Sequence, residues 1–283
     1  MKHEEGYFEG TGGLQLFRQS WFPEGDIRVA LAVVHGFGEH SGRYGNLVGV
    51  AVPKGYVVHA FDLRGHGRSP GPRGYINSFA DFREDVGRFL AWVQSQHPAL
   101  PLFLLGHSMG GLIVLEYVLH DADGLAGVVA SGPLLGQAGI SPLLFWMSRL
   151  LSGVLPRLTL NTSLDATTIS RDPAVVEAYV GDPLVHSLGT PRLSTELTKA
   201  YTWVQAHAGD LDLPCLIVQG GADQLVPPES VRQFYEHIRC ADKTLHIYPG
   251  YYHEVFNDIG KEQPLSDVMA WLEEHIQSGA TAS

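Results

Sequence analysis

The chain is poor in cysteine, in basic residues and in long apolar runs, and each shortage excludes a class of protein. Two cysteines among 283 residues cannot form the disulfide framework of a small secreted domain. Lysine and arginine total 19 against 30 acidic residues, and the formal net charge of −11 argues against binding to nucleic acid or to an anionic membrane. No uninterrupted apolar stretch reaches the roughly 20 residues that span a bilayer, and the N-terminus carries no apolar secretion signal. We therefore expect a cytoplasmic protein with no nucleic-acid partner.

The common cofactor and metal motifs are also missing. The sequence contains neither a Gly-x-x-x-x-Gly-Lys-Ser/Thr loop for phosphates nor a His-Glu-x-x-His pair for zinc, and its two cysteines have no metal-ligand spacing. The loop at 36–42 comes close to a dinucleotide-binding fingerprint, but its third glycine, Gly42, stands one position late. We therefore predict no cofactor and no metal ion.

A Gly-x-Ser-x-Gly motif is present at residues 106–110, directly after the apolar run 100–105. A helical pattern follows from Gly111, so Ser108 stands between a predicted buried strand and a predicted helix. At so sharp a turn the backbone is strained and the hydroxyl projects above the sheet, while the flanking glycines remove Cβ atoms that would collide. The alternative is a serine in an ordinary glycine-rich turn, but the preceding strand favours a nucleophile.

A serine hydroxyl requires a base, and the base requires a group that orients it. After a turn of this kind, an acid and then a histidine are expected along the chain, each in a loop that follows a strand. Asp223 follows the apolar run 213–218 and a Gly-Gly pair, and His253 follows the predicted strand 244–248. Asp223 could instead cap a helix, and His253 could be a solvated loop residue. Their order and their positions after two strands favour a catalytic triad with Ser108.

Predicted strands and helices alternate along the chain, which indicates an α/β protein whose mostly parallel sheet has helices on both faces. After an opening hairpin, the predicted strands lie near 28–34, 56–62, 101–106, 126–131, 214–219 and 243–248, and the predicted helices near 42–53, 78–97, 109–121, 229–239 and 262–277. The interval between the strands near 131 and 214 is too long for one crossover. We therefore expect a core formed by 1–135 and 209–283, with a cap inserted at 136–208 over the active site.

Four segments carry a resemblance to a known family: His-Gly-Phe-Gly-Glu-His-Ser-Gly-Arg-Tyr at 35–44, Asp-Leu-Arg-Gly-His-Gly-Arg-Ser at 62–69, the serine motif at 106–111, and Tyr-Pro-Gly-Tyr-Tyr-His-Glu at 248–254. Together they resemble the monoacylglycerol lipase and lysophospholipase branch of the serine α/β-hydrolases. The resemblance extends from about Val33 to the C-terminal helix and is weakest between about 137 and 208. It implies the α/β-hydrolase fold and an esterase that cleaves the acyl chain of a small lipid, a monoacylglycerol.

The mechanism also requires an oxyanion hole made of fixed donors, because negative charge develops on the carbonyl oxygen of the tetrahedral intermediate. One donor is the backbone amide after the nucleophile, at Met109. The family pattern places the other at Phe37, directly after His35 and Gly36. We expect His35 to hold this loop by hydrogen bonding and the Phe37 side chain to line the acyl pocket.

The predicted cap contains an amphipathic segment at 141–155. On a helical wheel the serines and Arg149 share one face, while the leucines, Trp146, Met147 and Val154 fill a broad apolar face. Part of this apolar face is expected to pack on the domain. The remainder suits an entrance for acyl chains and a surface that rests transiently on a micelle or membrane.

The residues predict two-step acyl transfer. His253 accepts the proton of Ser108, Asp223 orients the imidazole, and water then hydrolyses the acyl-enzyme. A lysophospholipase, a general carboxylesterase and an aminopeptidase of the same fold stay open as alternatives, as does a slow-turnover ligand receptor on this scaffold. No protein partner is indicated by the sequence.

Overall fold

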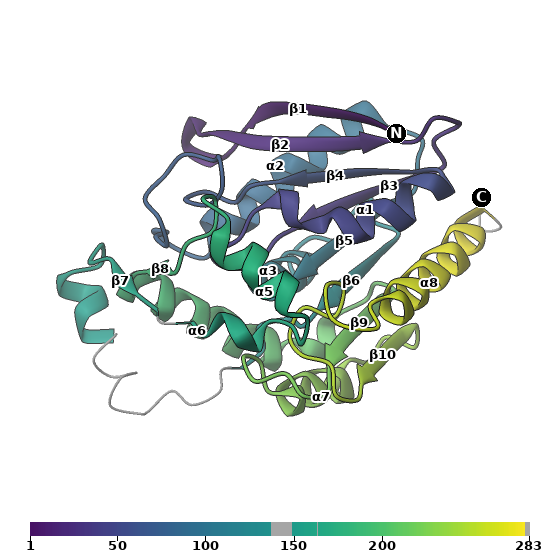
Figure 1. The fold of residues 1–283 in the computed structure, drawn as a ribbon. Coiled ribbons are helices and arrows are strands. Elements are labelled where there is room, and N and C mark those ends of the chain that lie inside the picture. The colour runs from purple at the N-terminus through teal and green to yellow at the C-terminus, as the bar shows by residue number, and fades with distance from the viewer. Residues whose placement is uncertain (137–148, 163, 281–283) are drawn as a thin grey trace.

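An eight-stranded sheet forms the centre of the computed structural model, which describes residues 1–136, 149–162 and 164–280 (Figure 1). The strands are β1 (Lys2–Glu9), β2 (Gln15–Phe22), β3 (Val29–Val34), β4 (Tyr56–Phe61), β5 (Leu102–His107), β6 (Gly127–Ser131), β9 (Cys215–Gly220) and β10 (Lys243–Tyr248). Their order in the sheet is β1-β2-β4-β3-β5-β6-β9-β10. All pairs from β4 to β10 are parallel, whereas β2 pairs antiparallel with β1 and β4. The predicted mostly parallel sheet and opening hairpin are confirmed.

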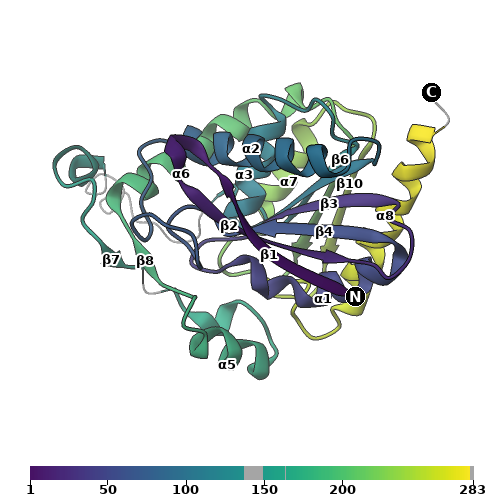
Figure 2. The same ribbon diagram turned by 90° about the horizontal axis from the view of Figure 1, so that it is seen from above.

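Helices cover both faces of this sheet (Figure 2). One face packs against α2 (Ala80–Gln96), α3 (Met109–Val118) and α7 (Pro228–His237), and the other against α1 (Gly45–Ala51) and α8 (Glu262–Ala280). Every residue of β3, β4, β5, β6 and β9 is buried. Strands buried on both faces need apolar side chains at successive positions, which explains the unbroken apolar runs in the sequence.

The helix ends differ from the predicted ones by a few residues. The largest difference is near 42–53, where α1 is flanked by two 3-10 turns at Ser41–Tyr44 and Val52–Lys54. Within the described residues, no helix combines the length and the apolar character that crossing a bilayer requires.

The long segment between β6 and β9 carries the elements of the predicted cap. They are a helical stretch at 149–154, β7 (Leu160–Asn161), α5 (Pro173–Gly181), β8 (Leu188–Gly189) and α6 (Pro191–Ala206). α6 packs on α3 and buries Leu193, Leu197 and Val204 in the core beneath it. The division into a core and an inserted cap at 136–208 stays a prediction. Of the amphipathic segment at 141–155, residues 141–148 lie outside the described residues.

Candidate active site

Ser108 occupies the turn between β5 and α3. Its backbone has φ 54° and ψ −116°, and in the described part of the chain no other residue except glycine has a positive φ. Only glycine fits at the two flanking positions, because neither has room for a side chain. A Cβ on Gly106 would lie 2.3 Å from Gly110 O, and a Cβ on Gly110 would lie 2.2 Å from Val34 O. Residues held in so strained a conformation cluster at functional sites. The expected sharp turn is therefore present, and Ser108 lines a cavity.

Asp223 and His253, in the loops after β9 and β10, are in contact. His253 Nδ1 donates to Asp223 Oδ2 over 2.7 Å, and both side chains are almost completely buried. The other carboxylate oxygen, Oδ1, accepts from the amides of Leu225 and Val226 at 2.8 and 3.0 Å. Since Nδ1 carries the proton of the neutral ring, Nε2 is its proton acceptor.

Burial opposes the charged form of each group, but the attraction between them is larger. Burial would raise the pKa of Asp223, yet the nearby imidazole and the hydrogen bonds to the carboxylate lower it. Burial would likewise lower the pKa of His253, yet the Asp223 carboxylate raises it. The pair is thus a carboxylate beside an imidazole that accepts a proton readily, which is what a general base needs.

Ser108 and His253 line the same cavity, whose volume is about 670 Å³. The hydrogen bonds of the described residues include none between Ser108 Oγ and the imidazole. Such catalytic contacts are often long until substrate binds. Of the three predicted residues, the structure therefore joins the acid and the histidine directly and brings the serine to the same cavity.

The loop after β3 approaches Ser108 closely. A Cβ on Gly36 would lie 3.2 Å from Ser108 Cβ. The Gly36 amide already donates to Glu39 Oε1 over 2.6 Å, whereas the next residue, Phe37, lines the cavity. Met109 is the first residue of α3, where N–H groups have no acceptor inside the helix. The two predicted oxyanion donors therefore belong to segments that lie beside Ser108.

His35 anchors this loop, as predicted. Its Nε2 accepts from the Leu63 amide over 2.8 Å, and its Nδ1 donates to Gly36 O over 2.7 Å. Because both ring nitrogens are engaged and the side chain is fully buried, His35 fixes the backbone and does not reach the cavity.

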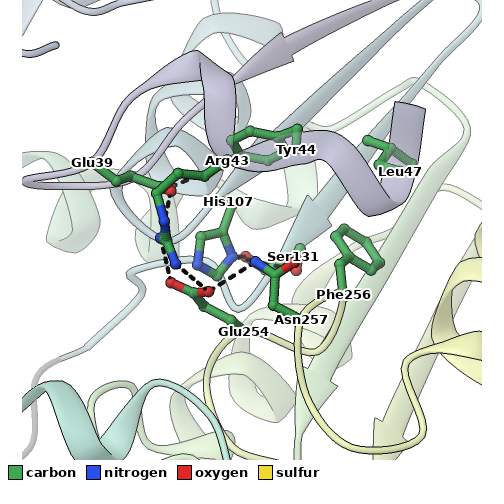
Figure 3. Close-up of a pocket in the computed structure, with 9 residues that line it drawn as sticks. All are labelled: Glu39, Arg43, Tyr44, Leu47, His107, Ser131, Glu254, Phe256 and Asn257. Atoms are coloured by element: carbon green, nitrogen blue, oxygen red, sulfur yellow. Dashed lines mark hydrogen bonds and ion pairs between the residues drawn. The ribbon is translucent and has the colours of Figure 1, made fainter. Parts of the chain in front are cut away.

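A buried network of charged residues lines part of the cavity wall and a second pocket that shares these residues (Figure 3). Its members Glu39, Arg43 and Glu254 lie in the motifs at 35–44 and 248–254, but the sequence assigned them no role. Arg43 donates to Glu254 Oε1 and Oε2 at 2.6 and 2.9 Å and to Glu39 Oε2 at 2.9 Å. Asn257 Nδ2 donates to Glu254 Oε2 over 2.8 Å. Burial would raise the pKa of Glu39, but Arg43 and neighbouring histidines lower it to about 2. Glu39 and Arg43 are four residues apart, a spacing typical of an ion pair, but Glu254 is 211 residues away.

His107 lies beside this network, and its ring is tilted by 50° to that of His253, with ring centroids 4.8 Å apart. Its Nδ1 donates to Ser131 O over 3.0 Å. Burial and the neighbouring His253 lower the pKa of His107, so the ring is neutral and its Nε2 is an acceptor. The cavity thus has a polar end next to Ser108.

The segment after α5 docks on the loop that follows β3. His40 Nε2 donates to Asp182 Oδ2 over 2.8 Å, and the His186 amide donates to Gly38 O over 2.8 Å. The ring of Phe37 meets that of His186 edge-on at 5.8 Å. The sequence did not predict these contacts, through which the segment after α5 supports the loop beside Ser108.

Apolar side chains from the segment between β6 and β9 and from the loop after β9 form most of the remaining wall. They include Leu134, Leu151, Leu160, Leu193, Leu197 and Leu225. A serine between an apolar wall and buried polar groups suits acyl transfer from an amphiphilic substrate. Within the described ranges, no group of three or more His, Cys, Asp or Glu residues is arranged to hold a metal ion.

Comparisons with known proteins agree with this chemistry. The family described as serine aminopeptidase, S33 (Hydrolase_4) matches residues 25–260. A monoacylglycerol lipase of Mycolicibacterium smegmatis is 36% identical over 95% of this chain and 96% of its own length. Phospholipase YtpA of Bacillus subtilis is 31% identical over 90% of this chain and all of its own length. The crystal structure of Paleococcus ferrophilus monoacylglycerol lipase superposes with a TM-score of 0.84 at 34% identity, covering 92% of this chain and 99% of that one.

Proposed function

This chain belongs to the serine aminopeptidase S33 (Hydrolase_4) family of α/β-hydrolases, and we propose that it hydrolyses monoacylglycerols with Ser108, His253 and Asp223 as its catalytic triad. The observation that carries the proposal is the cavity itself. Ser108 and His253 line a chamber of about 670 Å³ with leucines on its wall and buried polar groups at one end. That volume falls in the range of about 300–1,000 Å³ typical of small-molecule sites.

Acylation begins when His253 Nε2 takes the proton of Ser108 as Oγ attacks the ester carbonyl carbon. The amides of Phe37 and Met109 hold the resulting oxyanion, each donor contributing about 3 kcal/mol to transition-state stabilisation. When the ester C–O bond breaks, protonated His253 returns its proton to the glycerol oxygen. Water then attacks the acyl-enzyme in the same way and releases the fatty acid.

The charges at the polar end favour a neutral alcohol over the other leaving groups. Arg43 is already paired with Glu39 and Glu254, so the three side chains sum to one negative charge. A lysophospholipid would bring a phosphate against this charge. An aminopeptidase needs a carboxylate that accepts from the substrate's amine, but all four carboxylate oxygens of Glu39 and Glu254 accept from protein donors. The third carboxylate on the cavity wall, Asp165, lies outside this network, and its Oδ1 accepts from Thr167. The hydroxyl groups of glycerol require neither a positive charge, as a phosphate does, nor an available carboxylate, as an amine does.

The first test is fatty-acid release from a long-chain monoacylglycerol by wild type and Ser108→Ala. A lysophospholipid, a short-chain ester and an aminoacyl amide serve as competing substrates. We expect the highest kcat/KM on the monoacylglycerol and loss of turnover in the variant. Retained turnover in folded Ser108→Ala would refute the triad. Serine-dependent preference for the lysophospholipid or amide would keep the triad and refute the substrate.

The cap also supports a proposal about where the enzyme works: in the cytoplasm, resting transiently on a micelle or membrane. In its helical stretch at 149–154 a polar residue is buried and apolar residues are exposed, the opposite of the usual arrangement. Ser152 is buried, while Leu150 and Val154 are about 70% exposed. Three more exposed leucines follow, at 155, 158 and 160. Leu160 also lines the cavity, so this apolar surface adjoins the space that holds the acyl chain. The net charge of −11 favours an uncharged lipid surface over an anionic one. The two free cysteines favour a reducing compartment.

The membrane proposal is tested with Leu155→Asp/Leu158→Asp and a control, Ile259→Asp, which alters an exposed residue between β10 and α8. We expect the double variant to lose activity on monoacylglycerol in zwitterionic vesicles several-fold while keeping wild-type activity on a dissolved short-chain ester. Equal activity of the double variant and the control on vesicles would refute the docking surface.

A further inference from the structure

β9 contains a buried amide where its pattern calls for an apolar side chain. Side chains alternate between the two faces of a strand, so Cys215, Ile217 and Gln219 point the same way. Cys215 and Ile217 belong to the core on that face, and Gln219 is 0% exposed. Burying an amide costs about 1–3 kcal/mol unless hydrogen bonds compensate. A polar side chain at this position therefore requires an explanation.

The explanation lies in its partner. Gln219 Nε2 donates to Asp223 Oδ2 over 2.9 Å, and the same oxygen accepts from His253 Nδ1. The amide also reaches Val226 O at 3.4 Å, in the residue whose N–H donates to Asp223 Oδ1. Together with the Leu225 amide, this gives the carboxylate four donors, two on each oxygen. Gln219 Oε1 is buried without a hydrogen-bond partner in the described part of the chain. The side-chain hydrogen bonds of Gln219 are therefore all made by Nε2.

We propose that Gln219 is a positioning residue of the catalytic centre: its amide fixes the plane of the Asp223 carboxylate and shares the oxygen that binds the imidazole. This inference rests on the proposed triad. Without Gln219, Oδ2 keeps the imidazole as its one donor, so the carboxylate is held less firmly and orients His253 less well. Oδ2 also becomes a stronger acceptor, because it no longer divides its charge between two donors. The protonated imidazole of His253 is then stabilised more strongly. As pH falls, His253 therefore becomes protonated, and stops acting as a base, at a higher pH than in the wild type.

The test is Gln219→Met, which keeps an unbranched side chain of similar length and removes the donor. We expect kcat on monoacylglycerol to fall roughly tenfold, since a hydrogen bond to a charged group is lost. KM should stay within about twofold, because Gln219 is completely buried and does not meet substrate. The acid limb of kcat/KM against pH should move upward by about half a pH unit or more. Gln219→His, which restores an N–H donor at similar reach, should recover most of kcat.

A matched control is Gln19→Met. Gln19 is a second buried amide whose Nε2 donates to Ser41 Oγ over 2.7 Å, in β2 and away from the triad. Circular dichroism establishes that each variant is folded, and Gln219→Leu replaces the methionine variant if that one is not. A folded donorless variant with wild-type kcat and an unmoved acid limb overturns the inference. So does an equal loss of kcat in Gln19→Met. Turnover by Ser108→Ala would instead overturn the proposed function.

Discussion

Arg43 should contribute more to stability than an exposed arginine, because it neutralises two buried carboxylates at once. The side chains of Glu39 and Glu254 are 5% and 6% exposed, and Arg43 bonds both. Arg43→Met leaves these two charges buried and facing each other. Removing one partner of a buried ion pair costs about 3–5 kcal/mol.

The pKa of Glu39 gives an independent magnitude and a sign. The folded protein lowers it from 4.5 to about 2, which corresponds to about 3 kcal/mol of stability. A carboxyl group whose pKa is lower in the folded than in the unfolded protein contributes this stability fully when the pH is above its pKa in the unfolded protein. The contribution is lost as pH falls from about 5 towards 2. In Arg43→Met the carboxyl is no longer held ionised, so the difference from wild type should shrink as pH falls.

The assay is urea denaturation followed by tryptophan fluorescence at pH 7 and pH 4. We expect Arg43→Met to lower the free energy of unfolding by about 3 kcal/mol at pH 7 and by less at pH 4. Arg28→Met is the control, because Arg28 pairs with Glu273 while 48% exposed and should cost no more than about 1 kcal/mol. A loss below about 1 kcal/mol for Arg43→Met, or an equal loss at both pH values, would refute this reasoning.

Two further predictions concern the active site. A Cβ on Gly38, at φ 75°, would lie 2.2 Å from His186 O, whereas Gly12 has the same φ and open space. Gly38→Ala should therefore destabilise the protein and lower kcat well beyond Gly12→Ala, measured by thermal melting and ester hydrolysis; matching effects would contradict the close contact with the cap. Asp223→Asn should lower kcat by about 10⁴ with the fold intact. Because Asp223 raises the pKa of His253, wild-type kcat/KM should fall as pH drops through a value above 6.5; an acid limb below 6.5 would contradict that assignment.

The strand–turn–helix around Ser108 could be predicted because it is local. A buried strand, a glycine-flanked serine and a helix follow one another within about 20 residues, and the strain at φ 54° is a property of that short stretch. Asp223 and His253 could be predicted because each is tied to the end of a strand, and parallel strands bring their carboxyl ends to one edge. Local patterns thus determined the order of elements and the residues proposed for catalysis.

Contacts between distant segments could not be predicted in this way. The pairing of Arg43 with Glu254 joins residues 211 positions apart, and no periodicity in either segment specifies the other. Gln219 looks like an interruption of an apolar strand until Asp223 is placed beside it at 2.9 Å. For the segment at 141–155, the helical wheel separated polar from apolar residues but did not predict which side meets solvent.

The sequence by itself determined the α/β class, the parallel sheet and the serine at a strained turn, because hydrophobic periodicity and turn chemistry act over a few residues. Tertiary structure alone decided that Ser152 is buried and Val154 exposed, that Glu39, Arg43 and Glu254 meet on the cavity wall, and that the Gln219 amide supports the Asp223 carboxylate. Each of these depends on which elements pack together, and burial is a property of the packed assembly and not of any one segment.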